Sequence, residues 1–167
     1  MALQNLDVSD SLIKLGVYLK TSERIKAFCK DQFDKEISVY AGDFLRKDIP
    51  DERKTPYIVM TDFRKKEGQN IEFCDYEITF FVGVSCKKVE WIEESGIIMP
   101  DVFDVGAKLM TLIEDDLNDE TKRERPISKV IAHAPYPINP TGTHWVGDMV
   151  VTFRIYQTMG TNYQEDL

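Results

Sequence analysis

The sequence predicts an α+β fold in which helices pack on a mixed, largely antiparallel sheet of four to five strands, in a single domain. The segment 71–86 alternates apolar and mostly polar residues, a pattern typical of a strand with one buried face. The segment 100–117 repeats apolar residues at helical spacing, which predicts an amphipathic helix lying across the apolar face of the sheet. The buried face of the strand is predicted to carry Cys74, Tyr76, Ile78, Phe80, Val82, Val84 and Cys86.

Length and composition limit the class of protein. A chain of 167 residues, 43% of them hydrophobic, is long enough to bury one sizeable core. We expect one domain over 1–167, with an extended N-terminal segment, 1–24, and a flexible or docking tail, 157–167. The formal net charge of −8 argues against a dedicated reader of duplex DNA, which needs a concentrated basic face. No signal-peptide pattern or membrane-spanning apolar run occurs, so synthesis in the cytoplasm and no membrane partner are expected.

The N-terminal third predicts helix followed by a short strand and a loop. Ser9 and Ser11 are candidate caps of a first helix, and Ser22 either restarts or continues it toward Phe33, so one bent helix and two helices both stay open. A short strand is predicted over 37–40. The charged segment 43–55 is predicted to be a long loop, either mobile or used in contacts.

A hairpin is predicted next, from a strand over 57–63 into the alternating strand. Its tip, 64–70, is basic and contains glycine, so it is interpreted either as a solvated turn or as a contact surface. Phe81 is the large apolar residue on the polar face, and a helix, a loop or another subunit is expected to cover it. The segment 87–99 is too irregular to predict an element.

The far end of the amphipathic helix is unusual, because acidic residues crowd the negative end of the helix dipole. Two interpretations stay open: a solvated end partly neutralised by the basic residues after it, or an acidic patch that meets a basic surface on another subunit. A divalent cation is a third and weaker alternative, since no calcium-loop pattern is present. The acidic residues are Glu114, Asp115, Asp116, Asp119 and Glu120, and the basic ones are Lys122, Arg123 and Arg125.

The last third predicts two strands joined by a proline-rich link. A strand is expected over 127–133, and the three prolines of 134–142 predict a stiff connection that does not continue the ladder. The final strand, 143–156, is apolar on both sides, so it is covered twice within the domain or covered by a partner. One face carries Trp145, Met149, Val151, Phe153 and Ile155, and the other Val146, Val150 and Tyr156.

No residue pattern in the chain predicts catalysis, a cofactor or a metal. His133 and His144 have no histidine or cysteine at ligand spacing and are interpreted as strand-end residues. Three cysteines without zinc spacing are interpreted as packed thiols. No phosphate loop, dinucleotide fingerprint or nucleophile elbow occurs, so an enzyme is not expected.

The order of the predicted elements, together with four motifs, resembles the tail terminator (tail completion) proteins of tailed bacteriophages. The motifs are VYAGDF at 39–44, TPYIVM at 55–60, YEITFFVGV at 76–84 and MVVTFRIY at 149–156. The resemblance implies a structural virion protein without catalytic residues or cofactor. Six copies would form a ring that caps the tail tube, ends its polymerisation and joins a neck or connector protein. DNA would pass through without sequence-specific binding.

Under this resemblance, the residues expected at interfaces are the charged ones of the loop, the hairpin tip and the acidic helix end, with the end of the last strand. They are Asp43, Arg46, Lys47, Arg64, Lys65, Lys66, Glu114, Asp115, Asp116, Arg123, Arg125 and Tyr156. Two alternatives stay open: a neck or head-tail connector protein of similar ring architecture, and a small cytoplasmic ligand-binding or enzymatic α+β domain.

Overall fold

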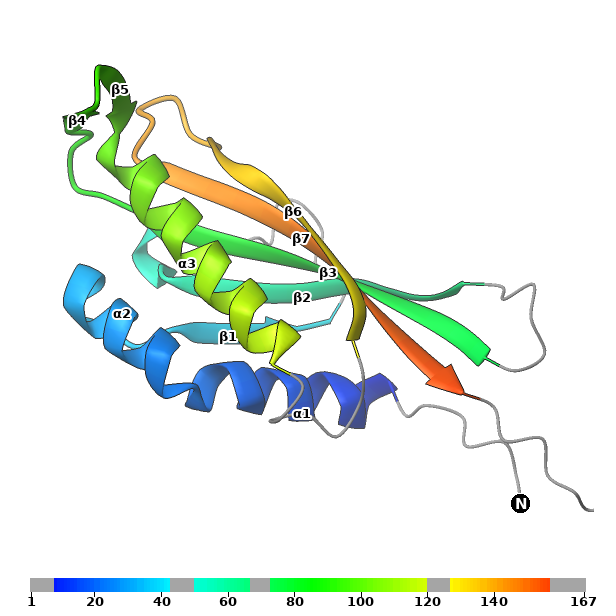
Figure 1. Cartoon of the computed structure of the whole chain (residues 1–167). Coiled ribbons are helices and arrows are strands. Elements are labelled where there is room, and N and C mark those ends of the chain that lie inside the picture. The colour runs from blue at the N-terminus through cyan, green and yellow to red at the C-terminus, as the bar shows by residue number, and fades with distance from the viewer. Residues whose placement is uncertain (1–7, 43–49, 67–72, 120–126, 157–167) are drawn as a thin grey trace, which may run out of the picture.

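The predicted α+β class is confirmed by the computed structural model, which describes residues 8–42, 50–66, 73–119 and 127–156 (Figure 1). Five strands form one mixed sheet in the order β1-β2-β3-β7-β6, with β1 parallel to β2 and the other neighbours antiparallel. A separate hairpin, β4–β5, stands beside it. The helices are α1 (Val8–Thr21), α2 (Glu23–Phe33) and α3 (Asp101–Asn118), with a short 3-10 helix, η2 (Glu52–Lys54). The strands are β1 (Ser38–Ala41), β2 (Tyr57–Lys66), β3 (Phe73–Ser85), β4 (Trp91–Glu94), β5 (Ile97–Pro100), β6 (Ile127–Pro137) and β7 (His144–Tyr156).

The central strand of the sheet is β3, as its alternating sequence predicted. It pairs with β7 over its whole length, from Phe73 opposite Tyr156 to Ser85 opposite His144. Its residues Ile78, Phe80, Val82 and Val84 are all buried in one core. The predicted strand is therefore confirmed, and its buried face is confirmed at these four residues, whereas Tyr76 and Cys86 are half-buried.

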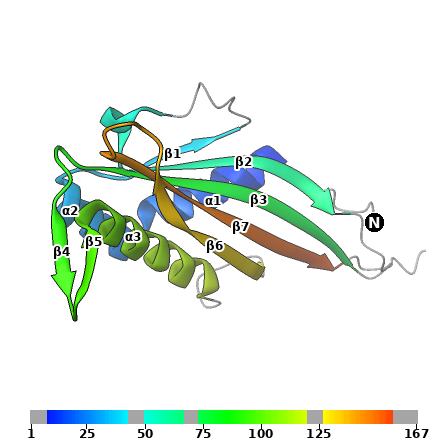
Figure 2. The same ribbon diagram turned by 90° about the horizontal axis from the view of Figure 1, so that it is seen from above.

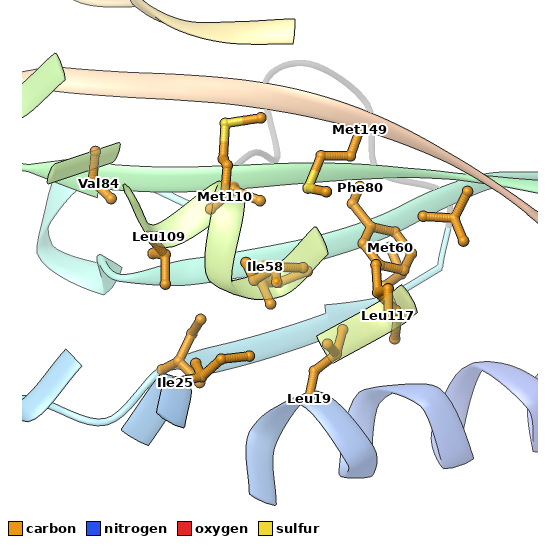
Figure 3. Packing of buried hydrophobic residues seen from close by; sticks show 14 of the residues in the cluster. Leu19, Ile25, Ile58, Met60, Phe80, Val84, Leu109, Met110, Leu117 and Met149 are labelled. Carbon is orange, nitrogen blue, oxygen red and sulfur yellow. The ribbon is translucent and has the colours of Figure 1, made fainter. Parts of the chain in front are cut away.

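All three helices pack on the same face of this sheet and close the main core (Figures 2 and 3). Leu109, Ile113 and Leu117 of α3 are fully buried, and Leu19 and Ile25 reach the same core from α1 and α2. Burial of each such side chain stabilises the fold by about 1.5–3 kcal/mol. The apolar stripe of α3 thus lies across the sheet as predicted.

The opposite face of the sheet carries a second, smaller cluster, formed by Tyr57, Val59 and Val146 with Tyr40 and Phe81 packed against it. Tyr57 lies directly over Gly83, where an added Cβ would come within 2.1 Å of the tyrosine Cζ. The Tyr57 hydroxyl lies 3.0 Å from His144 Nε2, which satisfies both buried polar groups. Phe81 and the second apolar face of β7 are therefore covered in part within the chain itself.

The N-terminal helix pattern resolves into two helices. Ser22 is the N-cap of α2, where its hydroxyl accepts a hydrogen bond from the Ile25 amide. Ser9 and Ser11 lie inside α1, so their prediction as caps was wrong.

Two other expectations are corrected, one at the β6 edge of the sheet and one in the segment 87–99. β6 runs on to Pro137, although its prolines predicted the end of the ladder. β6 is an edge strand, and its pairing with β7 shifts register between His133 and Tyr136, which accommodates residues without an amide donor. The segment 87–99, for which no element was predicted, contains the hairpin β4–β5.

Candidate interaction surfaces

The basic end of β2 is shaped by a β-bulge at Asp62. Thr61 pairs with Thr79 and Arg64 pairs with Glu77, so two residues of β2 stand opposite Ile78 alone. Asp62 adopts a left-handed conformation with φ 51°. The extra residue reverses the alternation of the strand. Phe63 therefore packs on the helix side, with its ring 5.6 Å from that of Tyr76.

Because of the same reversal, Arg64 and Lys66 lie beside Glu77 on the opposite face. Lys66 Nζ is 2.5 Å and Arg64 Nε 3.5 Å from carboxylate oxygens of Glu77, and Arg64 also pairs with Asp62 at 3.3 Å. Two of the three predicted basic residues are thus neutralised within the chain. Lys65 is exposed, and the structure records no ion pair for it among the described residues. The rest of the predicted tip, 67–70, lies outside the described residues.

The acidic end of α3 forms a helix junction with α1 and α2, which we define as Tyr18, Ser22, Arg24, Asp115 and Asp116. Asp116 is 2% exposed, and its carboxylate accepts hydrogen bonds from the Ser22 hydroxyl and, at 3.5 Å, from Arg24 Nη1. Its backbone carbonyl accepts a 2.6 Å bond from the Tyr18 hydroxyl. Asp115 is exposed and pairs with Arg24 Nη2 at 3.1 Å.

This junction corrects the predicted role of Asp116. The carboxylate is buried between α3 and the start of α2, so it is not exposed for contact with another subunit, and the Tyr18 hydroxyl joins α1 to the backbone of the same residue. One of the two interpretations named Lys122, Arg123 and Arg125 as neutralising residues, and these lie outside the described residues. For Asp116, Arg24 supplies a partner from more than 90 residues away in the chain. Glu114 is partly buried and Asp115 exposed, so these two remain on the surface.

The β4–β5 hairpin forms an apolar arm beyond the N-terminal end of α3 (Figure 1). Its two-residue turn is Ser95-Gly96, with φ values of 55° and 80°. These left-handed conformations belong to a type I′ turn, whose twist matches paired strands and favours glycine at the second position. Trp91, Ile97 and Ile98 are 67%, 62% and 64% exposed, so this arm carries a large apolar area in water.

A second apolar surface lies on the outer face of α1. Ile13 and Val17, one turn apart, are 62% and 55% exposed. The opposite side of the helix is buried through Leu12, Gly16 and Leu19. The sequence placed Ile13 and Val17 on this helix together with Leu12, Gly16 and Leu19, and it did not separate the buried side from the outer one.

Several predicted interface residues lie outside the described parts of the chain. They are Asp43, Arg46, Lys47, Arg123 and Arg125, together with the tail 157–167. The backbone of Tyr156 ends β7 opposite Phe73. The described part of the 43–55 loop contains η2, where Asp51 pairs with Arg53 at 2.6 Å. Of the predicted surfaces, the structure therefore describes mainly the hairpin base and the helix junction.

Burial and pairing surround two buried titratable groups and one histidine of the described chain. Burial raises the pKa of the Cys29 thiol to about 12 and also raises that of the Tyr57 hydroxyl. His133 Nδ1 lies 2.6 Å from Asp148 on the exposed sheet face. Within the described ranges, no three histidine, cysteine or acidic side chains gather as metal ligands would. No helix in these ranges is long and apolar enough to cross a membrane.

Comparison of the sequence with known protein families and with curated proteins found no match.

Proposed function

We propose that this protein is a virion structural subunit that assembles into a homo-oligomeric ring, with a hexamer expected, on the head-proximal end of a phage tail tube. The ring ends tube polymerisation and offers a joining surface to a neck or connector protein. The layout on which the resemblance rests supports the proposal, since the helix pair, the β2–β3 hairpin, α3 and the final β6–β7 pair occur in that order.

The observation that carries the proposal is the exposed apolar area of the single chain. Among the described residues, five large apolar side chains are more than half exposed, and they gather on the β4–β5 arm and on the outer face of α1. Soluble monomers rarely leave contiguous apolar patches in water unless a partner covers them. A two-stranded hairpin is also marginally stable alone, so the arm gains most from a partner.

The charge of the chain suits a protein that surrounds DNA without holding it. The formal net charge is −8, and the basic residues at the end of β2 are largely neutralised by Glu77 and Asp62. A negatively charged lumen repels phosphates and lets DNA slide. No sequence-specific DNA contact is part of the proposal.

The test combines the mass of the purified protein in solution with electron microscopy of the protein alone and mixed with phage tail tubes. Rings, or caps restricted to one end of each tube, are the expected result, and added protein should stop tube growth. Tubes without the protein, and tubes mixed with an unrelated acidic protein of similar size, serve as controls. A compact monomer or dimer that ignores tube ends would contradict the proposal and favour a ligand-binding domain.

A further inference from the structure

The two most exposed apolar surfaces of the chain differ in position. Figures 1 and 2 show the β4–β5 arm beyond one end of α3, whereas α1 runs beneath the sheet alongside β1, away from the arm. The arm and the outer face of α1 therefore do not cover each other within one chain. Two copies are needed to bring them together.

The two surfaces also differ in charge. From Glu90 to Pro100 the chain carries Glu90, Glu93 and Glu94 and no basic residue. The exposed side of α1 carries Lys14, Lys20 and one acid, Asp10, which pairs with Lys14 at 3.0 Å, while Arg24 just beyond the helix is held by Asp115 and Asp116. Each surface thus has an apolar centre, with three glutamates around that of the arm and, around that of α1, two lysines and one aspartate that leave a net charge of +1.

The register of the arm selects its docking face. Trp91 stands opposite Pro100 and Glu93 opposite Ile98, so Trp91, Glu93 and Ile98 share one face. Ile92 and Met99 lie on the other face and are half-buried, whereas Trp91 and Ile98 are exposed. The face with Trp91 and Ile98 is therefore the one directed to solvent, and tryptophan is enriched at interface centres.

We propose that the Trp91–Ile98 face of one copy docks on the Ile13–Val17 face of α1 in the next copy, with Glu90 and Glu93 near Lys14 and Lys20. This contact rests on the proposed function, because it names the joint between neighbouring subunits of the ring. It joins two different surfaces, so it is heterologous and propagates in one direction, closing into a ring when the rotation allows.

The test uses two double variants of the full chain, W91E/I98E on the arm and I13E/V17E on α1. Each alone loses one half of the contact, so self-association should weaken at least about tenfold, as expected when an interface centre is charged. A mixture of the two retains one intact arm and one intact α1 face. It should form a 1:1 pair by analytical ultracentrifugation, and nothing larger.

The matched control is Ile131→Glu, which charges another exposed apolar residue on β6 and should leave the association unchanged. Circular dichroism establishes that every variant is folded. If a glutamate variant does not fold, charge exchange replaces it: E90K/E93K and K14E/K20E should each weaken association, and a chain that carries both exchanges should regain it.

The outcomes separate this inference from the proposed function. If the wild type forms rings or tube caps and both double variants form them equally well, the inference is overturned and the proposed function still stands. Wild-type chains that associate through these faces without rings or caps would support the inference and contradict the proposed function. Loss of association in the arm variant alone would overturn the contact. A wild type that stays monomeric at every concentration and does not assemble on tube ends would overturn it too.

Discussion

The two ends of α3 distribute polarity in opposite ways. At its C-terminal end, a carboxylate is buried at the helix junction, where Ser22 and Arg24 bind Asp116. At its N-terminal end, the β4–β5 arm holds Trp91 and Ile98 in solvent. The comparison teaches that charge density and hydropathy in the sequence do not by themselves locate a surface. A charge is buried where partners from other elements satisfy it, and an apolar residue is exposed where its element extends past the core.

The difference also concerns what each end contributes. The junction joins three helices, so its residues should affect the free energy of unfolding of the chain. The arm contacts little of its own chain, so its residues should affect association and leave unfolding nearly unchanged. Four measurements test this division, in order from the largest expected effect to the smallest.

Truncation of one buried and one exposed aliphatic residue provides the largest contrast. Leu117→Ala, next to the junction, should lower the free energy of unfolding by about 2–5 kcal/mol, because it leaves a cavity in the main core. Ile98→Ala removes as many carbon atoms from the arm and should change the free energy of unfolding by less than about 0.5 kcal/mol. Urea unfolding of the monomeric chain measures both. Equal losses would show that the arm is part of the core.

Neighbouring carboxylates at the junction provide the second contrast. Asp116→Ala leaves the Ser22 hydroxyl and one Arg24 nitrogen without their acceptor and should destabilise the fold by about 1–3 kcal/mol. Asp115→Ala removes an exposed pair with Arg24 and should have an effect of about 0–1 kcal/mol. The same unfolding experiment compares them. A larger loss for Asp115 would contradict the internal role of Asp116.

The pH dependence of stability that arises from Cys29 tests whether water reaches the packed side of α2. Its pKa is raised from 9.0 to about 12 in the folded chain, so the unfolded chain loses this proton first as the pH rises. The contribution of this thiol to the free energy of unfolding is fully present below pH 9. It falls between pH 9 and 12 by about 1.4 kcal/mol per pH unit. The wild type should therefore lose about 1.4 kcal/mol more than Cys29→Ala between pH 8 and pH 10 in urea unfolding. Parallel pH profiles would show that the thiol is accessible to water.

The turn of the arm should show the smallest effect. Ser95→Asn should favour the hairpin by a few tenths of a kcal/mol, since Asn-Gly is preferred in a type I′ turn. Gly96→Ala should weaken it, because the φ of 80° strains a residue with a Cβ. Amide hydrogen exchange of β4 and β5 reports both changes. Association of the chain should follow the same direction, and a rise in exchange for Ser95→Asn would contradict the turn assignment.

Local sequence predicted the elements whose apolar residues recur regularly and face one core. The alternation of Ile78, Phe80, Val82 and Val84 predicted β3, and the helical spacing of Leu109, Ile113 and Leu117 predicted α3 and its position on the sheet. The arm escaped prediction, because Trp91, Ile97 and Ile98 do not face a common core and so leave no periodic pattern. Its Ser95-Gly96 turn was the one local signal available.

By itself, then, the sequence determined the α+β class, the central strand and the helix that covers it, because burial on one face leaves a period in the chain. Only the tertiary structure decided which charged side chains are paired within the chain. Asp116 meets Ser22 and Arg24 across more than 90 residues, and the bulge at Asp62 turns Arg64 and Lys66 toward Glu77. The physical reason is that a charge is stabilised by its neighbours in space. Helix packing and one extra residue in a strand determine these neighbours, and neither produces a periodic pattern in the sequence.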